Sequence, residues 1–343
     1  MRGTRQPQAH LDADTKSSHS TATIFRLLIV RLRAHPPAAG FSTGENQVKD
    51  IVLQGIELET EMFKDAVDAL KPAKVLFRRS DPSLRVCGVA DDADLSALEA
   101  LALAHQVDCI AVPADFSIKA FKVWATDMDS TLTQNECIDD MAFAAGCGDE
   151  VARVTKEAMH GAWSFTESLE KRVSLLKGTQ ASVVIDHAIR RERLTYGAEA
   201  LIKLCRRHGI ATYIVSGGFV QIARDTAKEL GMTGAVCNEL VIDANGMLTG
   251  EVRGPAGGRI LDADGKRRAV EVLAQIAGAD MSQVICSGDG ANDVEMVSAA
   301  GLGVAFHPKP VLASHAKAVI RFGGLDVLAH LFKECWVDAV RVA

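Results

Sequence analysis

The stretch that decides the fold is FKVWATDMDSTL, residues 121–132, in which an apolar run ends in two aspartates separated by one residue. Val123 to Thr126 has the β-branched and aromatic composition of a short buried strand. In open α/β sheets, ligands bind beyond the carboxyl ends of the strands. We therefore expect the chemistry of this protein to lie where this strand ends, at Asp127 and Asp129.

Two later apolar runs end in the same way. Ile210 to Val215 is followed by Ser216-Gly217-Gly218, and Val284 to Ser287 is followed by GDGAND at 288–293. The segments between the runs are long enough for right-handed helical crossovers, which predicts a parallel sheet wound with helices. Polar residues from three distant parts of the sequence would then meet at one edge of that sheet.

The composition limits the classes of function. The chain has 343 residues, of which 48% are hydrophobic and 24% charged, so it can form more than one domain. A net charge of −6 gives no overall attraction to nucleic acid, and no apolar run is long enough to span a membrane. Eight scattered cysteines without a C-x-x-C pair fit reduced thiols, which predicts a cytoplasmic protein.

The order of predicted elements divides the chain into four parts. Residues 1–47 have little periodicity and are expected to be disordered or an extension of the folding unit. Residues 48–115 follow the order β-α-β-β-α-β of a ferredoxin-like α+β domain, which resembles the ACT domain in element order only. This domain could pack against the rest, form a homodimer contact or bind an amino acid, and the sequence does not choose among these.

The remainder is expected to be a Rossmann-like α/β core over 120–134 and 210–343, with a helical insertion at 135–209. The insertion directly follows the first strand that carries candidate residues, so we interpret it as a cap that excludes water from the site. Ser164 and Glu167 have the spacing of a capping box at a helix start. Asn245-Gly246 between apolar positions predicts a β-hairpin.

The aspartates suggest a nucleophile, an acid and a cation site. Of two neighbouring carboxylates, one can ionise while the other is driven toward its protonated form, which suits Asp127 as nucleophile and Asp129 as acid. Asp289 and Asp293 would join them at the same edge, and a site of carboxylates without histidine favours Mg²⁺. Each motif taken singly also fits a hydrated turn or an ordinary connection between a strand and a helix.

The turn Ser216-Gly217-Gly218 precedes a helix expected from about Phe219 to Leu230. Backbone N–H groups at such a position can bind the oxygens of a phosphoryl group. A tight turn without any ligand fits the same residues.

Two cations occupy apolar helix faces. Arg172 lies on the stripe formed by Phe165, Leu169 and Leu176, and a buried arginine requires an anionic partner. The partner could be a substrate or a structural carboxylate. Lys266 shares a face with apolar residues of a later helix, where it could neutralise a phosphate or the nucleophile, or extend its ammonium group to solvent.

These residues together resemble the haloacid dehalogenase superfamily of phosphotransferases: DMDST at 127–131, SGG at 216–218, Lys266, and GDGAND at 288–293. Glu136, the stretch 157–159 and the stretch 165–176 are similar to the phosphoserine phosphatase family within it. The resemblance covers the chain from about residue 120 to its end. It implies Mg²⁺-dependent hydrolysis of L-phosphoserine through an aspartyl-phosphate, in which Asp127 attacks phosphorus and Asp129 serves as general acid and then base.

The resemblance also implies roles for the other residues. Mg²⁺ would bind the carboxylates of Asp127 and Asp289 and the backbone carbonyl of Asp129, and Asp293 would orient these ligands. Glu136 would face the substrate ammonium and Arg172 its carboxylate. The residues expected at the phosphoryl group are Ser216, Gly217, Lys266 and Asn292, with Gly218 in support and with Met159 and Phe165 excluding water.

Three alternatives remain open. A related enzyme could act on another small phosphomonoester, such as homoserine phosphate. A phospho-accepting receiver module also places an aspartate at a strand end, and Lys309-Pro310 resembles its lysine, although the D-x-D pair and the cap disfavour it. The chain could also be an amino-acid sensor that binds its ligand in residues 48–119.

Overall fold

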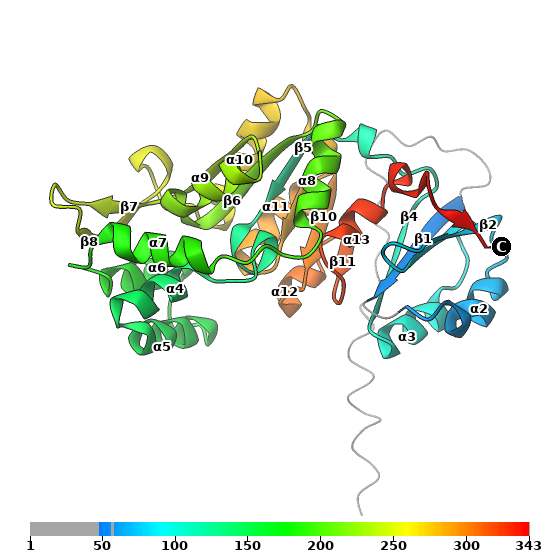
Figure 1. Cartoon of the computed structure of the whole chain (residues 1–343), viewed down its shortest axis with the longest axis horizontal. Coiled ribbons are helices and arrows are strands. Elements are labelled where there is room, and N and C mark those ends of the chain that lie inside the picture. Colours follow the sequence, from blue (N-terminus) through cyan, green and yellow to red (C-terminus); the bar gives the residue numbers. More distant parts are fainter. Residues whose placement is uncertain (1–47, 56–57, 343) are drawn as a thin grey trace, which may run out of the picture. The chain divides into compact units, whose positions relative to one another are not determined.

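The computed structural model describes residues 48–55 and 58–342, so the prediction made for residues 1–47 lies outside the described part of the chain. The described residues form two β-sheets, one antiparallel and one mainly parallel, with helices packed on both (Figure 1). The fold class predicted from the sequence is confirmed.

The first sheet is the ferredoxin-like domain. Its strands are antiparallel in the order β12-β2-β3-β1-β4, which is the pairing that a β-α-β-β-α-β unit forms, with one strand added at an edge. Phe63 and Leu98 anchor helices α2 and α3 on one face of the sheet. The elements are β1 (Val48–Gly55), α2 (Thr60–Ala69), β2 (Lys74–Arg78), β3 (Ser83–Ala90), α3 (Ser96–Ala104) and β4 (Val107–Pro113).

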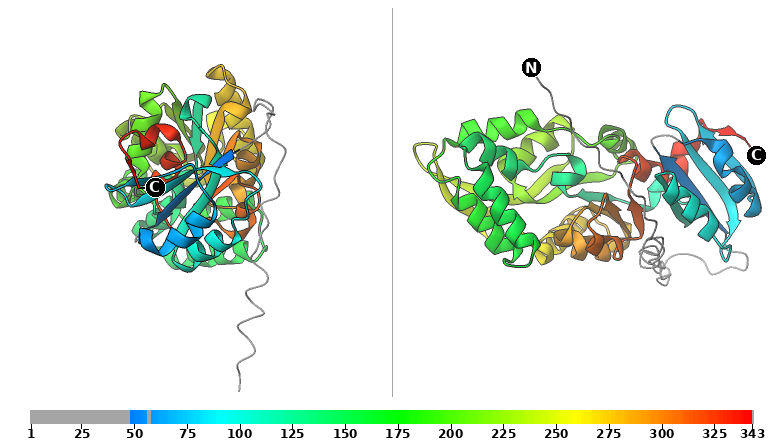
Figure 2. Two further views of the ribbon diagram at one scale, coloured as in Figure 1. Left: turned by 90° about the vertical axis from the view of Figure 1, so that its right-hand side faces the viewer. Right: turned by 90° about the horizontal axis from the view of Figure 1, so that it is seen from below.

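The other face of this sheet is covered by the C-terminal segment. The added strand β12 (Val340–Arg341) pairs with β2, and Figure 2 shows it in red beside the blue N-terminal strands. Arg85 of β3 is only 1% exposed. It forms an ion pair with Asp50 at 2.9 Å and donates to the carbonyl of Leu331 at 3.0 Å. The chain therefore closes its first domain with its last residues.

The second sheet has the order β11-β10-β9-β5-β6-β7-β8, with all neighbours parallel except the hairpin of β7 and β8. The strands β9, β5 and β6 lie side by side, as the three apolar runs predicted. The strands are β5 (Val123–Thr126), β6 (Ala211–Phe219), β7 (Gly234–Ile242), β8 (Leu248–Arg253), β9 (Val284–Gly288), β10 (Leu302–Phe306) and β11 (Ala318–Ile320).

The side chains of β5 alternate between the two layers of this core. Val123 and Ala125 pack in a cluster with α10 (Ala263–Ile276) and α11 (Val294–Ala299). Trp124, between them in sequence, belongs to the cluster that contains α8 (Ala198–Arg207), α9 (Val220–Glu229) and α13 (Asp326–His330). Because successive side chains of a strand point to opposite faces, a strand buried on both faces must be apolar throughout.

The insertion after β5 is helical, as expected. Its helix α6 begins with the predicted capping box, in which Ser164 and Glu167 each bond the backbone of the other. An antiparallel bridge between Thr133 and Leu194 joins the chain where it leaves and re-enters the core. The helices are α4 (Cys137–Ala145), α5 (Gly148–Met159), α6 (Phe165–Ser174) and α7 (Ala181–Arg191), whereas α8, also within the predicted cap range, packs on β6 and α13.

Candidate active site

The centre of the site is a buried chain of three charges. Lys266 is 0% exposed, and its Nζ lies 2.8 Å from Asp127 Oδ2 and 2.7 Å from Asp293 Oδ1. The other oxygen of Asp293 accepts hydrogen bonds from the backbone N–H groups of Asp289 and Gly290. Lys266 therefore does not extend to solvent, and that alternative is wrong, because two carboxylates compensate its charge inside the protein.

The chain makes a tight loop directly after β5. Asp127 N donates to the carbonyl of Ser287 on β9 at 2.8 Å, which fixes the start of the loop on the neighbouring strand. Thr133 N then donates back to the carbonyl of Met128, and Ser130 takes a positive φ of 56° inside the loop. This folding brings Asp127, Asp129 and Ser130 to the same edge of the sheet.

Asp129 has the environment of a proton donor. Its Oδ1 accepts a hydrogen bond from the backbone N–H of Cys137 at 3.0 Å. Burial, followed by the nearby charge of Glu136, raises the pKa of the Asp129 carboxyl to about 8. A carboxyl group that keeps its proton near neutral pH can act as a general acid.

Carboxylate oxygens of Asp127, Asp289 and Asp293 all lie within 4.8 Å of one another, close enough to hold a metal ion. The donor set is made of oxygen only, which fits a hard divalent cation and not zinc. Asp127 and Asp293 both pair with Lys266 and accept hydrogen bonds from backbone amides, whereas among the described residues Asp289 pairs only with Lys309, through Oδ2. The chain therefore has a site that could hold a metal.

The Ser216-Gly217-Gly218 segment differs from the predicted turn. It lies within β6, which continues to Phe219 past an irregularity in its pairing with β7, and helix α9 starts only at Val220. Gly218 N donates to Ser216 Oγ at 3.0 Å. The phenyl ring of Phe165 from the cap packs on Gly217, where a Cβ atom would lie 2.5 Å from its Cζ.

Asn238, which the sequence analysis did not single out, supports this segment. It is 0% exposed, and its amide donates to the carbonyl of Gly217 at 2.9 Å while accepting from Leu261 N at 2.7 Å. A lone asparagine in a strand carries no sequence signal for such a role, because its partners lie 21 and 23 residues away. The bond to Gly217 fixes a backbone that would face a phosphoryl group.

The cap contributes Glu136 and Arg172. Glu136 precedes helix α4 and accepts a hydrogen bond from Ser130 Oγ at 2.8 Å, and burial raises its pKa. Arg172 lies on α6, where its Nε donates to the carbonyl of Ser168 at 3.3 Å. Burial lowers the pKa of the Arg172 guanidinium group, and the charges of Glu136, Asp139 and Asp129 act in the opposite direction. Within residues 48–55 and 58–342, no ion pair to Arg172 is found, so its remaining N–H groups can bind an anion.

The other predicted residues do not all lie at the site in this structure. Asn292 lies in the turn after β9, next to Gly290 and the aspartates. Met159 is 75% exposed, because the last turn of α5 leaves its side chain on the surface in this arrangement. Its shielding role stays a prediction. Ser130 and Lys309 line the site without having been assigned to it.

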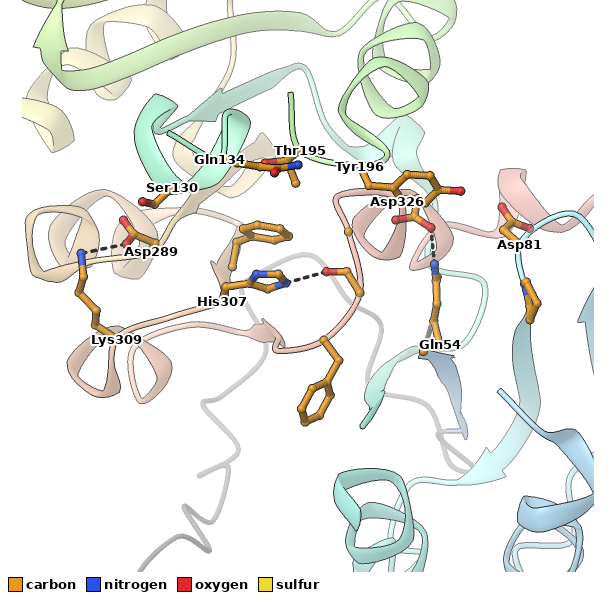
Figure 3. Close-up of a pocket in the computed structure, with 16 residues that line it drawn as sticks. Gln54, Asp81, Ser130, Gln134, Thr195, Tyr196, Asp289, His307, Lys309 and Asp326 are labelled. Carbon is orange, nitrogen blue, oxygen red and sulfur yellow. Dashed lines mark hydrogen bonds and ion pairs between the residues drawn. The ribbon is translucent and has the colours of Figure 1, made fainter. Parts of the chain in front are cut away.

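A cavity of about 810 Å³ opens beside these residues. Ser130, Asp289 and Lys309 line one end of it, and Gln54 and Asp326 line the other (Figure 3). The described residues belong to one compact unit, 38–343, so the cavity lies within a single body. Its volume is ample for a small phosphorylated molecule.

A family model described as haloacid dehalogenase-like hydrolase matches residues 125–298, about half of the chain. The chain belongs to this family. The chain is 43% identical over 246 residues to the phosphoserine phosphatase of Streptomyces coelicolor, a match that covers 72% of this chain and 58% of that protein. It spans between half and two thirds of the length of several curated relatives that it matches.

Solved structures show the same fold for this haloacid dehalogenase-like hydrolase. A family hydrolase from Salmonella enterica serovar Typhi superposes with a TM-score of 0.74 at 25% identity, over 83% of this chain and 99% of that one. A phospho-aspartyl intermediate analogue of a phosphoserine phosphatase superposes with a TM-score of 0.57 at 38% identity, over 62% of this chain and 99% of that one.

All eight cysteines lie in the described residues, and none forms a disulfide. Within the same residues, no helix combines the length and the apolar character that crossing a membrane requires.

Proposed function

We propose that this hydrolase converts L-phosphoserine to L-serine and phosphate through an aspartyl-phosphate on Asp127. The observation that carries the proposal is the juxtaposition of two groups of residues. Asp127, Asp129, Lys266 and Asp289 form the centre, and Glu136 and Arg172 face it from the cap. The phosphoserine phosphatases among its relatives support this substrate.

In the proposed reaction, Asp127 attacks phosphorus and the serine oxygen leaves with a proton from Asp129. A deprotonated Asp129 then takes a proton from the water that hydrolyses the aspartyl-phosphate, which restores both residues. Lys266 is already fixed against Asp127 at 2.8 Å and would stabilise negative charge as it moves onto the phosphoryl oxygens. Ser216, the N–H of Gly217 and Asn292 would bind those oxygens.

The proposed cofactor is Mg²⁺, which would supply positive charge to the phosphoryl oxygens when bound. Asp127, Asp289 and the backbone carbonyl of Asp129 would hold it, and Asp293 would orient Lys266 and the Asp289 turn from behind. The preference of an all-oxygen site for hard cations supports this choice. EDTA should therefore abolish turnover, and added Mg²⁺ should restore it.

The cap residues would provide the specificity. Glu136 would bind the substrate ammonium and Arg172 its carboxylate, a pair of charge-assisted contacts that an aryl phosphate cannot make. Phe165 would exclude water over Gly217. The rates of phosphate release from L-phosphoserine, phosphothreonine and an aryl phosphate test this. If release from the aryl phosphate were faster, the protein would still be a phosphatase, but the assignment of L-phosphoserine as its substrate would be wrong.

The Asp127→Asn variant tests the covalent step. We expect it to fold, because asparagine has the same shape, and to lose turnover, because an amide cannot attack phosphorus. Glu136→Gln is a useful companion, since it should retain turnover of an aryl phosphate. Turnover by Asp127→Asn at the wild-type rate would remove the covalent mechanism.

Two further properties belong to this proposal. The scattered spacing of the eight cysteines, without a C-x-x-C pair, supports cytoplasmic residence. The ferredoxin-like domain is proposed as a homodimer contact, and the mass of the full chain in solution, measured by light scattering, tests this directly. A monomer would leave packing within the chain as the role of that domain.

A further inference from the structure

A second lysine pairs with one aspartate of the proposed metal site. The Nζ atom of Lys309 lies 3.0 Å from Asp289 Oδ2 (Figure 3). Within residues 48–55 and 58–342, this is the one ion pair that Asp289 forms. Lys266 does not share it, since its ammonium group is bonded to Asp127 and Asp293. The two lysines therefore neutralise different aspartates of the same cluster.

The backbone fixes Lys309 at this place. Its own N–H donates to the carbonyl of Asp289 at 2.8 Å, so the two residues are joined through main chain and side chain. Two residues earlier, His307 stacks on Phe306 with ring centroids 4.1 Å apart and contacts the carbonyl of Gly323 through Nε2 at 2.8 Å. Pro310 begins helix α12 (Pro310–Ala313) directly afterwards. The position of Lys309 beside Asp289 therefore follows from the fold.

The side chain of Lys309 borders solvent. Lys309 is 55% exposed at its side chain, whereas Lys266 is completely buried. A lysine stem with four methylene groups can turn its ammonium group away from a partner at small cost when solvent is near. The cavity beside it provides that room, because Lys309, Asp289 and Ser130 line the same end. Lys309 can leave Asp289, and Lys266 cannot leave Asp127.

We propose that Lys309 is a positioning residue that holds the carboxylate of Asp289 when no cation is bound and yields it when a divalent cation binds. This inference rests on the proposed function, because it takes Asp289 as a metal ligand. A cation that binds Asp289 must displace the ammonium group and then tolerate a positive charge nearby. Lys309 thereby lowers the affinity of the site for the metal while it keeps Asp289 ordered.

Isothermal titration of the metal-free full-length chain with MgCl₂, without substrate, tests the inference. Lys309→Met removes the competing charge and should bind Mg²⁺ about tenfold more tightly than the wild type. Lys309→Arg keeps the charge and should stay within about twofold of the wild type. Lys228→Met removes an exposed lysine from α9 and is the matched control, for which no change is expected.

The outcomes separate the two proposals. Equal or weaker Mg²⁺ binding by Lys309→Met, with a normal response of the wild type, would overturn the role of Lys309 and leave Asp289 as a ligand. If Asp289→Asn bound Mg²⁺ as tightly as the wild type, the proposed metal site itself would be wrong. A crystal structure of the Mg²⁺ complex gives a second readout: Lys309 Nζ should have left Asp289, and an intact ion pair beside a bound Mg²⁺ would contradict the inference.

Discussion

Lys266 and Asp127 form a buried ion pair, with Nζ 2.8 Å from Oδ2 and both side chains almost inaccessible to solvent. Asp293 holds the same ammonium group from the other side at 2.7 Å. Burial of three charges is costly, so their arrangement is retained only if each has a partner. This pairing joins β5, α10 and the turn after β9, and it orients the proposed nucleophile before any substrate binds.

Lys266→Met should therefore damage both stability and activity. It leaves two buried carboxylates without their cation, which should cost about 3 to 5 kcal/mol in the free energy of unfolding. Turnover of L-phosphoserine should fall by about 10²-fold or more, since a charge aimed at the phosphoryl oxygens is lost. Urea unfolding and steady-state kinetics measure the two effects. Arg268→Met, on an exposed face of the same helix, is the control and should change neither strongly.

Arg172→Lys should separate substrate recognition from chemistry. Arginine can form two parallel hydrogen bonds to a carboxylate, and lysine cannot. We expect the KM for L-phosphoserine to rise about tenfold or more, with little change in the KM for an aryl phosphate. Steady-state kinetics on both substrates provide the comparison. An equal rise in KM for the two substrates would mean that Arg172 stabilises the cap instead of binding the substrate carboxylate.

Glu192 should make stability depend on pH. Burial raises its pKa from 4.5 to about 7, although Thr226 donates a hydrogen bond to it at 2.8 Å. The pKa is raised in the folded state, so the protonated form of Glu192 adds to the free energy of unfolding. This contribution is fully present below the pKa of the unfolded state and is lost as pH rises through about 7. Above that value, the charged carboxylate destabilises the folded protein.

Glu192→Gln should thus be more stable than the wild type at pH 8, by on the order of 1 kcal/mol, and should differ little at pH 5. Thermal unfolding at both pH values measures the difference. Glu170→Gln, at an exposed position of α6, is the matched control. The same stability difference at both pH values would show that the effect does not arise from titration of Glu192.

Arg85→Met should weaken the closure of the first domain by the C-terminal segment. The change leaves Asp50 without its ion pair and the carbonyl of Leu331 without its donor, at a cost of about 3 to 5 kcal/mol. Urea unfolding measures it. The double variant Arg85→Met with Asp50→Asn should recover part of the loss, because the unpaired carboxylate is then absent. No recovery would mean that the contacts to the C-terminal carbonyls dominate.

Local sequence signals determined most of the fold. The strand Val123–Thr126, the hairpin at Asn245-Gly246 and the capping box at Ser164 all appear where their patterns indicate. Such features depend on residues that are neighbours along the chain, so periodicity and turn chemistry are sufficient to predict them. The meeting of Asp127 and Asp129 with the distant Asp289 was also predictable, because the carboxyl ends of parallel strands lie at one edge of the sheet.

Only the tertiary structure decided which distant groups pair. The ion pair between Lys309 and Asp289, the bond from Asn238 to Gly217 and the strand β12 join segments with no common sequence pattern. The helix-face anomaly of Lys266 allowed a pairing with the nucleophile Asp127, but it did not indicate Asp293 as the second partner. A sequence shows which side chains cannot remain in water, and the partners that compensate them depend on how the sheets and helices pack.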